Sequence, residues 1–210
     1  MLKALGAAGQ AGPVPDDVGN DAIFEAPVVG ETQVPPHRVN SAVLAALFEE
    51  DEEARLVFTR RSVDLRTHQG QVSFPGGRIE PGEDPTAAAL REAFEEVDLD
   101  PALVTTVGWL HPLQTMVSAS FILPVLGVLA ARPHLKPNPS EVERIFDVSL
   151  ADLADLSIFH EERWRIPGRA IEGSDDNSFP VWFFEVAGEM IWGATVRMLH
   201  ELLGIVLSVV

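Results

Sequence analysis

A run of carboxylates beside a glycine-rich turn constrains this chain more than any other feature. Residues 77 to 99 read GRIEPGEDPTAAALREAFEEVDL. At about 100° per residue, Glu92, Glu95 and Glu96 share an arc of roughly 100° on one side of a helix. Their i, i+3 and i+4 spacing places like charges next to one another, which destabilises an isolated helix. The pattern therefore indicates a neighbouring positive charge, and carboxylate oxygens suit hard divalent cations such as Mg²⁺.

The rest of this segment predicts how the helix begins, ends and packs. Asp84 can cap the first turn, Pro85 suits the first helical position, and Asp98 tolerates the left-handed conformation common just past a helix end. The arc opposite the carboxylates carries the apolar side chains Leu90, Phe94 and Val97. We expect that arc to enter a hydrophobic core.

A solvated helix face is the simpler explanation of the three glutamates, and for EAFEE alone it would be preferred. Two neighbouring features favour a site instead. A sharp turn, Phe74-Pro75-Gly76-Gly77, precedes the helix, and Glu83 is available as a partner for Arg91. Glycine also lets the main chain approach an ion closely, so we expect the Gly76 carbonyl to be a further ligand.

The segment resembles the signature of the Nudix hydrolases, G-x5-E-x7-R-E-U-x-E-E-x-G-U, in which U is apolar. The matching residues are Gly77, Glu83, Arg91, Glu92, Ala93, Glu95, Glu96 and Leu99. Asp98 replaces the family's last glycine, a mild departure because aspartate enters the left-handed region at modest cost. The resemblance implies an α+β fold, a Nudix-type α/β/α sandwich with a central mixed sheet.

The resemblance also implies roles for these residues. Glu92 and Glu96 would be the principal ligands of Mg²⁺ or Mn²⁺, with Glu95 as a further ligand or as a base acting through water. Arg91 and Glu83 would hold the carboxylates in place. Nudix enzymes place the final proton acceptor variously, and Glu141 and Glu143 are the candidates outside the signature, with a solvated strand or helix start as the alternative for both.

A second pattern lies upstream and narrows the resemblance to the coenzyme A pyrophosphatase branch. That branch carries an approximate T-x-R-S-x-x-L-R-x-H-x-G-Q-V-x-F-P-G-G stretch that leads directly into the Nudix signature. The matches here include Thr59, Arg61, Ser62, Leu65, Arg66, His68, Gly70 and Gln71. We expect Arg61, Ser62, Arg66, His68 and Gln71 to bind substrate, together with the nearby Arg78.

The resemblance implies metal-dependent hydrolysis of a phosphoanhydride bond in coenzyme A or acyl-coenzyme A, giving 3′,5′-ADP and (acyl-)4′-phosphopantetheine. One alternative is a Nudix pyrophosphatase for another nucleoside diphosphate derivative, such as ADP-ribose, a dinucleotide or a nucleoside triphosphate. Another is a non-catalytic nucleotide-binding module, against which the complete carboxylate set argues. A homodimer is implied by the resemblance alone.

Composition narrows the classes of partner. The net charge of −17 argues against an interface with nucleic acid, and a phosphorylated substrate would need cations and local arginines to overcome it. The absence of cysteine excludes disulfides and thiolate sites. The longest apolar stretch, residues 121–131, is too short to span a bilayer, and the N-terminus does not resemble a secretory signal, so we expect a cytoplasmic protein without a membrane partner.

The chain divides into an arm and one domain. Residues 1–38 are rich in glycine, proline and alanine without periodicity, and we expect a flexible N-terminal arm before a Nudix hydrolase domain over residues 39–210. A strand from Ser41 and its hairpin partner, Arg55 to Thr59, should flank a solvated acidic turn. Further strands are expected through Val72 and over 104–110, 121–129, 164–171 and 181–186, with helices over 150–156 and 194–203.

Overall fold

The computed structural model describes residues 39–65, 68–115, 120–165 and 177–208. The expected arm, residues 1–38, and the substrate-binding candidate Arg66 lie outside these ranges. In the described part, no helix is long and apolar enough to cross a bilayer.

The fold begins with the predicted hairpin. Strands β1 (Ser41–Glu50) and β2 (Glu53–Arg61) are antiparallel, with Glu50 opposite Glu53. Asp51 and Glu52, which connect them, have φ angles of 52° and 65°, the two positive values of a tight turn that matches strand twist. The acidic tract thus supplies a turn, as expected.

The hairpin is the centre of a mixed sheet of eight strands, whose main path runs β3-β2-β1-β7-β5. Strand β1 is parallel to β7 and antiparallel to β2 and β4. Strand β8 pairs with β2, and β6 with β7. The remaining bounds are β3 Val72–Ser73, β4 Gly76–Arg78, β5 Val104–Trp109, β6 Leu113–Gln114, β7 Phe121–Leu129 and β8 Val142–Ser149.

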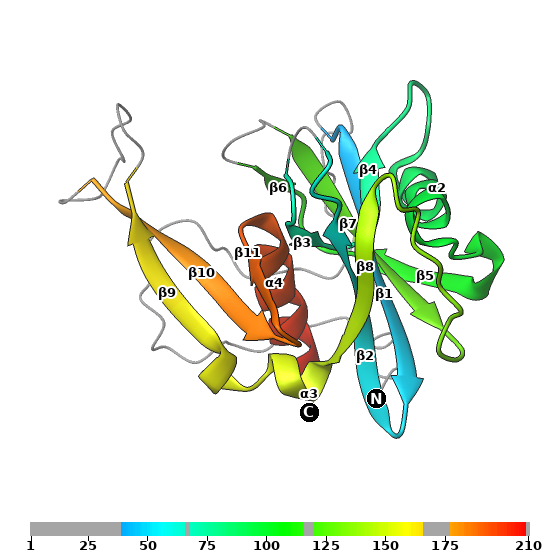
Figure 1. The fold of residues 1–210 in the computed structure, drawn as a ribbon. Coiled ribbons are helices and arrows are strands. Elements are labelled where there is room, and N and C mark those ends of the chain that lie inside the picture. The colour runs from blue at the N-terminus through cyan, green and yellow to red at the C-terminus, as the bar shows by residue number, and fades with distance from the viewer. Residues whose placement is uncertain (1–38, 66–67, 116–119, 166–176, 209–210) are drawn as a thin grey trace.

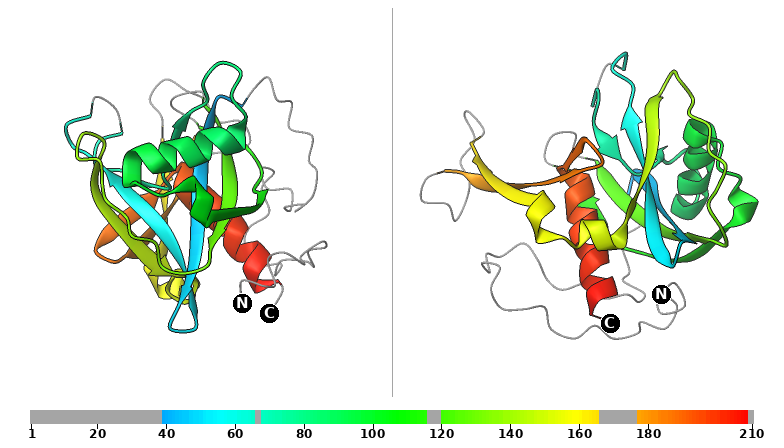
Figure 2. Two further views of the ribbon diagram at one scale, coloured as in Figure 1. Left: turned by 90° about the vertical axis from the view of Figure 1, so that its right-hand side faces the viewer. Right: turned by 60° about the horizontal axis from the view of Figure 1, so that its bottom comes forward.

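Helices cover the two faces of this sheet and make three layers (Figure 1). Helix α2 (Pro85–Val97) packs on one face, as the left panel of Figure 2 shows. Helix α4 (Ala194–Leu207) covers the other face together with a small sheet of β9 (Phe159–Trp164), β10 (Phe179–Val186) and β11 (Glu189–Trp192). The predicted α/β/α sandwich with a mixed central sheet is confirmed.

Strand β1 is buried on both sides, so it serves two cores. Alternate side chains, Ala42, Leu44, Ala46 and Phe48, join the cluster that packs against α2. The others, Val43, Ala45 and Leu47, join the larger cluster that includes α4. This period of two explains why the strand reads as a continuous apolar run.

Several boundaries differ from those expected. Strand β9 ends at Trp164, where a strand was predicted to begin, and residues 166–171 of that prediction lie outside the described ranges. The predicted helix over 150–156 is shorter, α3 (Leu150–Leu153), and a 3₁₀ turn follows at Leu156–Ile158. Helix α4 continues past the predicted end to Leu207. Strands β4, β6, β8 and β11 were not predicted.

The predicted core face of α2 was partly wrong. Phe94 is 50% exposed, whereas Val97 is buried as expected. The side that meets the sheet carries Ala89, Ala93 and Glu96, spaced i, i+4 and i+7. Alanine lets the helix approach β1 closely, and Glu96, which lies on the same side as these alanines, is buried with them.

We predict that Gly76→Ala destabilises the fold by about 3 kcal/mol or more, because overpacking backbone against backbone leaves little to relax. An added Cβ at Gly76 would lie 2.5 Å from Val43 Cα and overlap the Ala42 carbonyl oxygen. Gly82→Ala is the control, since φ is +83° there but nothing lies within 4 Å of the added Cβ, so only about 1–2 kcal/mol of strain is expected. Urea unfolding of both variants measures this, and equal losses would contradict the close approach.

Candidate active site

Helix α2 holds its acidic residues rigidly because both of its ends are capped. The Asp84 carboxylate accepts from the Thr86 and Ala87 backbone N–H groups, at 2.9 and 3.2 Å, and Pro85 begins the helix. At the other end Asp98 is left-handed, with φ 58° and ψ 32°, and its N–H donates to the carbonyls of Ala93 and Phe94. The three sequence signals for the helix ends are confirmed.

Arg91 is the centre of a hydrogen-bond network across the outer side of α2. Its Nε and Nη2 donate to the two carboxylate oxygens of Glu83, at 2.8 and 3.0 Å. Its Nη1 donates to Glu92 at 3.0 Å and to Glu95 at 3.1 Å, and Nη2 also reaches the Arg78 carbonyl at 2.9 Å. The bidentate pair with Arg91 lowers the pKa of Glu83, and the acidic partners raise that of Arg91.

Glu96 lies deepest of the acidic residues. Only 2% of it is exposed, and its Oε2 accepts from the Gly76 N–H at 3.1 Å, which joins the helix to the glycine turn. Its Oε1 accepts from Arg61 Nη1 at 3.3 Å. Burial raises the pKa of Glu96 to about 7, because the bonds from Gly76 and Arg61 offset only part of the lost hydration.

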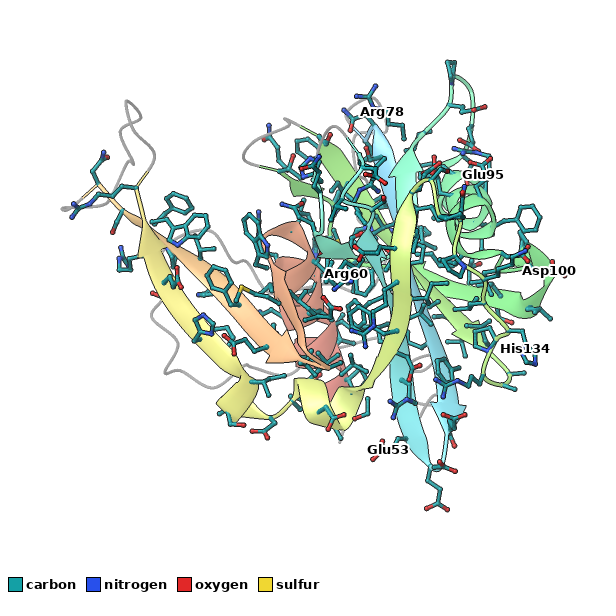
Figure 3. All side chains as sticks on the ribbon, viewed as in Figure 1. Glu53, Arg60, Arg78, Glu95, Asp100 and His134 are labelled. Atoms are coloured by element: carbon teal, nitrogen blue, oxygen red, sulfur yellow. The ribbon has the colours of Figure 1, made fainter. Side chains whose placement is uncertain are left out.

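Glu92 and Glu95 differ in their surroundings. Glu92 packs over Gly77 so closely that a Cβ there would lie 2.5 Å from the Glu92 carboxylate. Burial raises the pKa of Glu92, with Arg91 acting in the opposite direction. The Glu95 side chain is 52% exposed, and it lies with Arg78 at the same end of the fold (Figure 3). Position 77, in β4, therefore has to be glycine for Glu92 to lie where it does.

Of the two later proton-acceptor candidates, the structure brings only Glu141 to this cluster. The Glu141 carbonyl accepts from the Ser62 N–H at 2.8 Å, and its negative charge contributes to the raised pKa values of Glu92 and Glu96. Glu143 instead accepts from Arg60 Nη2 at 2.8 Å.

The substrate-binding candidates occupy several different positions. Arg61 contacts Glu96, as described. Ser62 is buried, and its hydroxyl accepts from the Asp64 N–H at 3.3 Å. His68 Nδ1 lies 2.8 Å from Gln71 Oε1, so these two side chains contact each other just before β3. Arg78 is exposed, and its main-chain carbonyl accepts a hydrogen bond from Arg91. The pairing of Arg61 with Glu96 was not predicted, because no local pattern joins residues so far apart in sequence.

The donor chemistry of the cluster suits a divalent cation. Carboxylate oxygens of Glu92, Glu95 and Glu96 project from one turn of helix beside the Gly76 main chain, and hard cations prefer such oxygen ligands. Burial raises the pKa of Glu92 and Glu96, and a cation bound beside them would favour their ionised forms. Among the described residues, however, no three His, Cys, Asp or Glu side chains already converge as ligands, since Arg91 and Arg61 hold the carboxylates.

A comparison with protein families shows to which family this chain belongs. The NUDIX domain model matches residues 38–171, more than half of the chain, and the match includes the glycine turn, α2 and all of β8. The chain belongs to the Nudix family. It is a Nudix hydrolase, an enzyme class that acts on phosphoanhydride bonds and generally uses divalent metal ions.

Relatives carry the same family name. The Nudix hydrolase NudL of Photorhabdus laumondii is 36% identical over 148 residues, which cover 70% of this chain and 74% of that protein. Nudix hydrolase 15, mitochondrial, of Arabidopsis thaliana is 38% identical over 168 residues, covering 76% of this chain and 55% of that protein. Among solved structures, a C. elegans Ap4A hydrolase has a TM-score of 0.46 and 19% identity, covering 54% of this chain and 82% of that one.

We predict that burial of Glu96 makes the stability of this Nudix hydrolase fall as pH rises. The folded state keeps the Glu96 proton up to about pH 7, whereas an unfolded glutamate loses it near 4.5. The contribution of Glu96 is therefore fully present below pH 4.5 and lost as pH rises through 7, about 3 kcal/mol in all. With EDTA present to remove metal ions, we expect the free energy of unfolding of the wild-type protein, minus that of Glu96→Gln, to decline from pH 5 to pH 8. If the two free energies change in parallel over this range, the effect assigned to the burial of Glu96 is contradicted.

Proposed function

We propose that this Nudix hydrolase cleaves the phosphoanhydride bond of coenzyme A or acyl-coenzyme A, releasing 3′,5′-ADP and (acyl-)4′-phosphopantetheine. The proposal rests on one observation: the segments that carry the two sequence patterns contact each other in the folded chain. Arg61 and Ser62, from the upstream pattern, contact Glu96 and Glu141, which lie within and after the Nudix signature. The segment that resembles the coenzyme A branch therefore forms one wall of the acidic site.

The polar segment between β2 and β3 is joined to the end of β2 by main-chain hydrogen bonds. Its ends are tied together, because the Arg61 N–H donates to the Gln71 carbonyl at 2.9 Å and the Gly70 N–H donates to the Arg61 carbonyl at 3.2 Å. His68 has a positive φ of 58° and is held by Gln71. The Gln71 main chain is thus paired with Arg61, and the Gln71 side chain contacts His68; all three side chains are of types that bind phosphate and adenosine oxygens.

We assign Glu96, Glu92 and Glu95, with the Gly76 carbonyl, to hold Mg²⁺ or Mn²⁺. When bound, a divalent cation neutralises the phosphate oxygens and makes hydroxide available near neutral pH. Gly76 fixes Glu96 by its N–H, so the deepest carboxylate is oriented before any ligand arrives. Arg91 and Glu83 position Glu92 and Glu95 from behind.

We assign the final proton acceptor to Glu141 in preference to Glu95. The Glu95 carboxylate accepts a hydrogen bond from Arg91 at 3.1 Å, so it is already engaged by that guanidinium. The Glu141 main chain is fixed by Ser62 and by Asn138, whose carbonyl accepts the Glu141 N–H at 3.0 Å. This fixed main chain brings the Glu141 carboxylate toward the acidic cluster, where it can accept a proton from the attacking water.

The proposed substrate is tested by steady-state kinetics on coenzyme A, acetyl-coenzyme A, ADP-ribose and a dinucleoside polyphosphate, each with Mg²⁺ and with Mn²⁺. We expect kcat/KM for the coenzyme A compounds to exceed the others by about tenfold or more. If coenzyme A turns over no faster than the rest, the substrate assignment fails. If no diphosphate is cleaved, a binding module is favoured.

The proposed ligand role of Glu96 is tested by Glu96→Gln, which keeps the side-chain volume and can still accept from Gly76. We predict at least about a 100-fold fall in kcat, because a cation ligand is lost at the reacting phosphates. Glu80→Gln, an exposed glutamate between β4 and α2, is the control and should retain full activity. Retained activity in Glu96→Gln, with circular dichroism unchanged, would contradict the ligand assignment.

A further inference from the structure

Two consecutive arginines at the end of β2 leave the strand on opposite faces of the sheet. Arg60 donates to Glu189 of β11 at 3.1 Å and to Glu143 of β8 at 2.8 Å, which joins the small sheet to the main one (Figure 3). Arg61 points the other way, to Glu96 of α2 at 3.3 Å. The pairing of β2 with β8 shifts register between these two residues. Arg61 is thus directed into the acidic site by the strand itself.

Arg61 is held far less firmly than Arg91. Within the described residues its guanidinium makes one side-chain hydrogen bond, the long one to Glu96, and its Nε is buried without a partner. The Arg91 guanidinium makes four to carboxylates, two of them a bidentate pair with Glu83, and a fifth hydrogen bond to the Arg78 main-chain carbonyl. A buried donor without a partner costs free energy, so the folded chain gains little from this placement of Arg61 apart from its charge.

We propose that Arg61 is a displaceable cation, which pairs with the ionised Glu96 carboxylate in the absence of metal and must be released when a divalent cation binds. The proposal rests on the assignment of Glu96 as a cation ligand. Arg61 therefore competes with the cation and weakens its binding. Arg91, with its several fixed acceptors, stays in place and positions the other carboxylates.

A positioning role for Arg61 would have the opposite consequence. If Arg61 only orients Glu96, its removal leaves a disordered ligand and weaker cation binding. If Arg61 is a competitor, its removal frees Glu96 and tightens binding, because Gly76 still fixes the carboxylate. The sign of the change in cation affinity distinguishes the two roles.

The experiment is a calorimetric titration of Mn²⁺, without substrate, into the wild-type protein, Arg61→Gln, Arg61→Lys and Arg78→Gln. We expect the Kd for Mn²⁺ to fall about threefold or more in Arg61→Gln. Arg61→Lys keeps the charge and should restore the wild-type Kd. Arg78→Gln removes an equal charge at the same end of the fold, from a side chain that is exposed, and should change the Kd little.

Three results would overturn the proposal: a higher Kd in Arg61→Gln, an unchanged Kd, or an equal fall in Arg78→Gln, which would indicate a general effect of net charge. A failure of the proposed function would give a different result from a failure of this proposal. In that case Mn²⁺ does not bind the wild-type protein, or binds Glu96→Gln equally well.

A measurement on the unsubstituted side chain covers the case in which Arg61→Gln does not fold. In the wild-type protein, Mg²⁺ is titrated while the arginine Nε–Hε signals are followed by NMR, with Arg61→Lys used for assignment. We expect the Arg61 signal to move and to exchange faster with water, whereas the Arg91 signal stays protected. An Arg61 signal that is unaffected at saturating Mg²⁺ would contradict displacement.

Discussion

The site depends on one hydrogen bond, from the backbone N–H of Gly76 to the buried carboxylate of Glu96. It joins β4, which pairs with the central strand β1, to the helix that carries the other acidic groups. The bond forms because α2 rests on the sheet through alanines, and because Gly76 and Gly77 leave room where any Cβ would collide with β1 or with Glu92. Packing, rather than the charge pattern alone, therefore determines which glutamate is buried and which remain near solvent.

Charge compensation around α2 follows from the same arrangement. A chain of net charge −17 gathers four glutamates here, and two arginines offset them in different ways. Arg91 uses most of its donors and forms a fixed scaffold with Glu83. Among the residues that the structure describes, the Arg61 guanidinium makes one long hydrogen bond, to Glu96, and its Nε has no partner. The first arrangement stabilises the helix face at all times, whereas the second leaves the deepest carboxylate available to a competing cation.

Local signals in the sequence predicted local structure well, and the contacts between distant segments were harder to predict. Asp84, Pro85 and Asp98 located the ends of α2 because capping involves only neighbouring backbone groups, and the acidic tract located the turn of the first hairpin for the same reason. Phe94 was assigned to the core wrongly, since hydrophobicity favoured the large side chain whereas close packing selected alanine. Strand β8 was missed because its exposed charges interrupt the alternation, and its pairing with β2 spans more than eighty residues. The joining of Arg61 to Glu96 follows from that same long-range arrangement.

The most direct test of the account is an anomalous difference map from crystals of the wild-type protein soaked with Mn²⁺. The account predicts a peak bonded to a Glu96 carboxylate oxygen, beside the Gly76–Gly77 turn, with the Arg61 guanidinium moved away from Glu96. A Mn²⁺ peak elsewhere, with the bond from Arg61 to Glu96 intact at full occupancy of the ion, would contradict it.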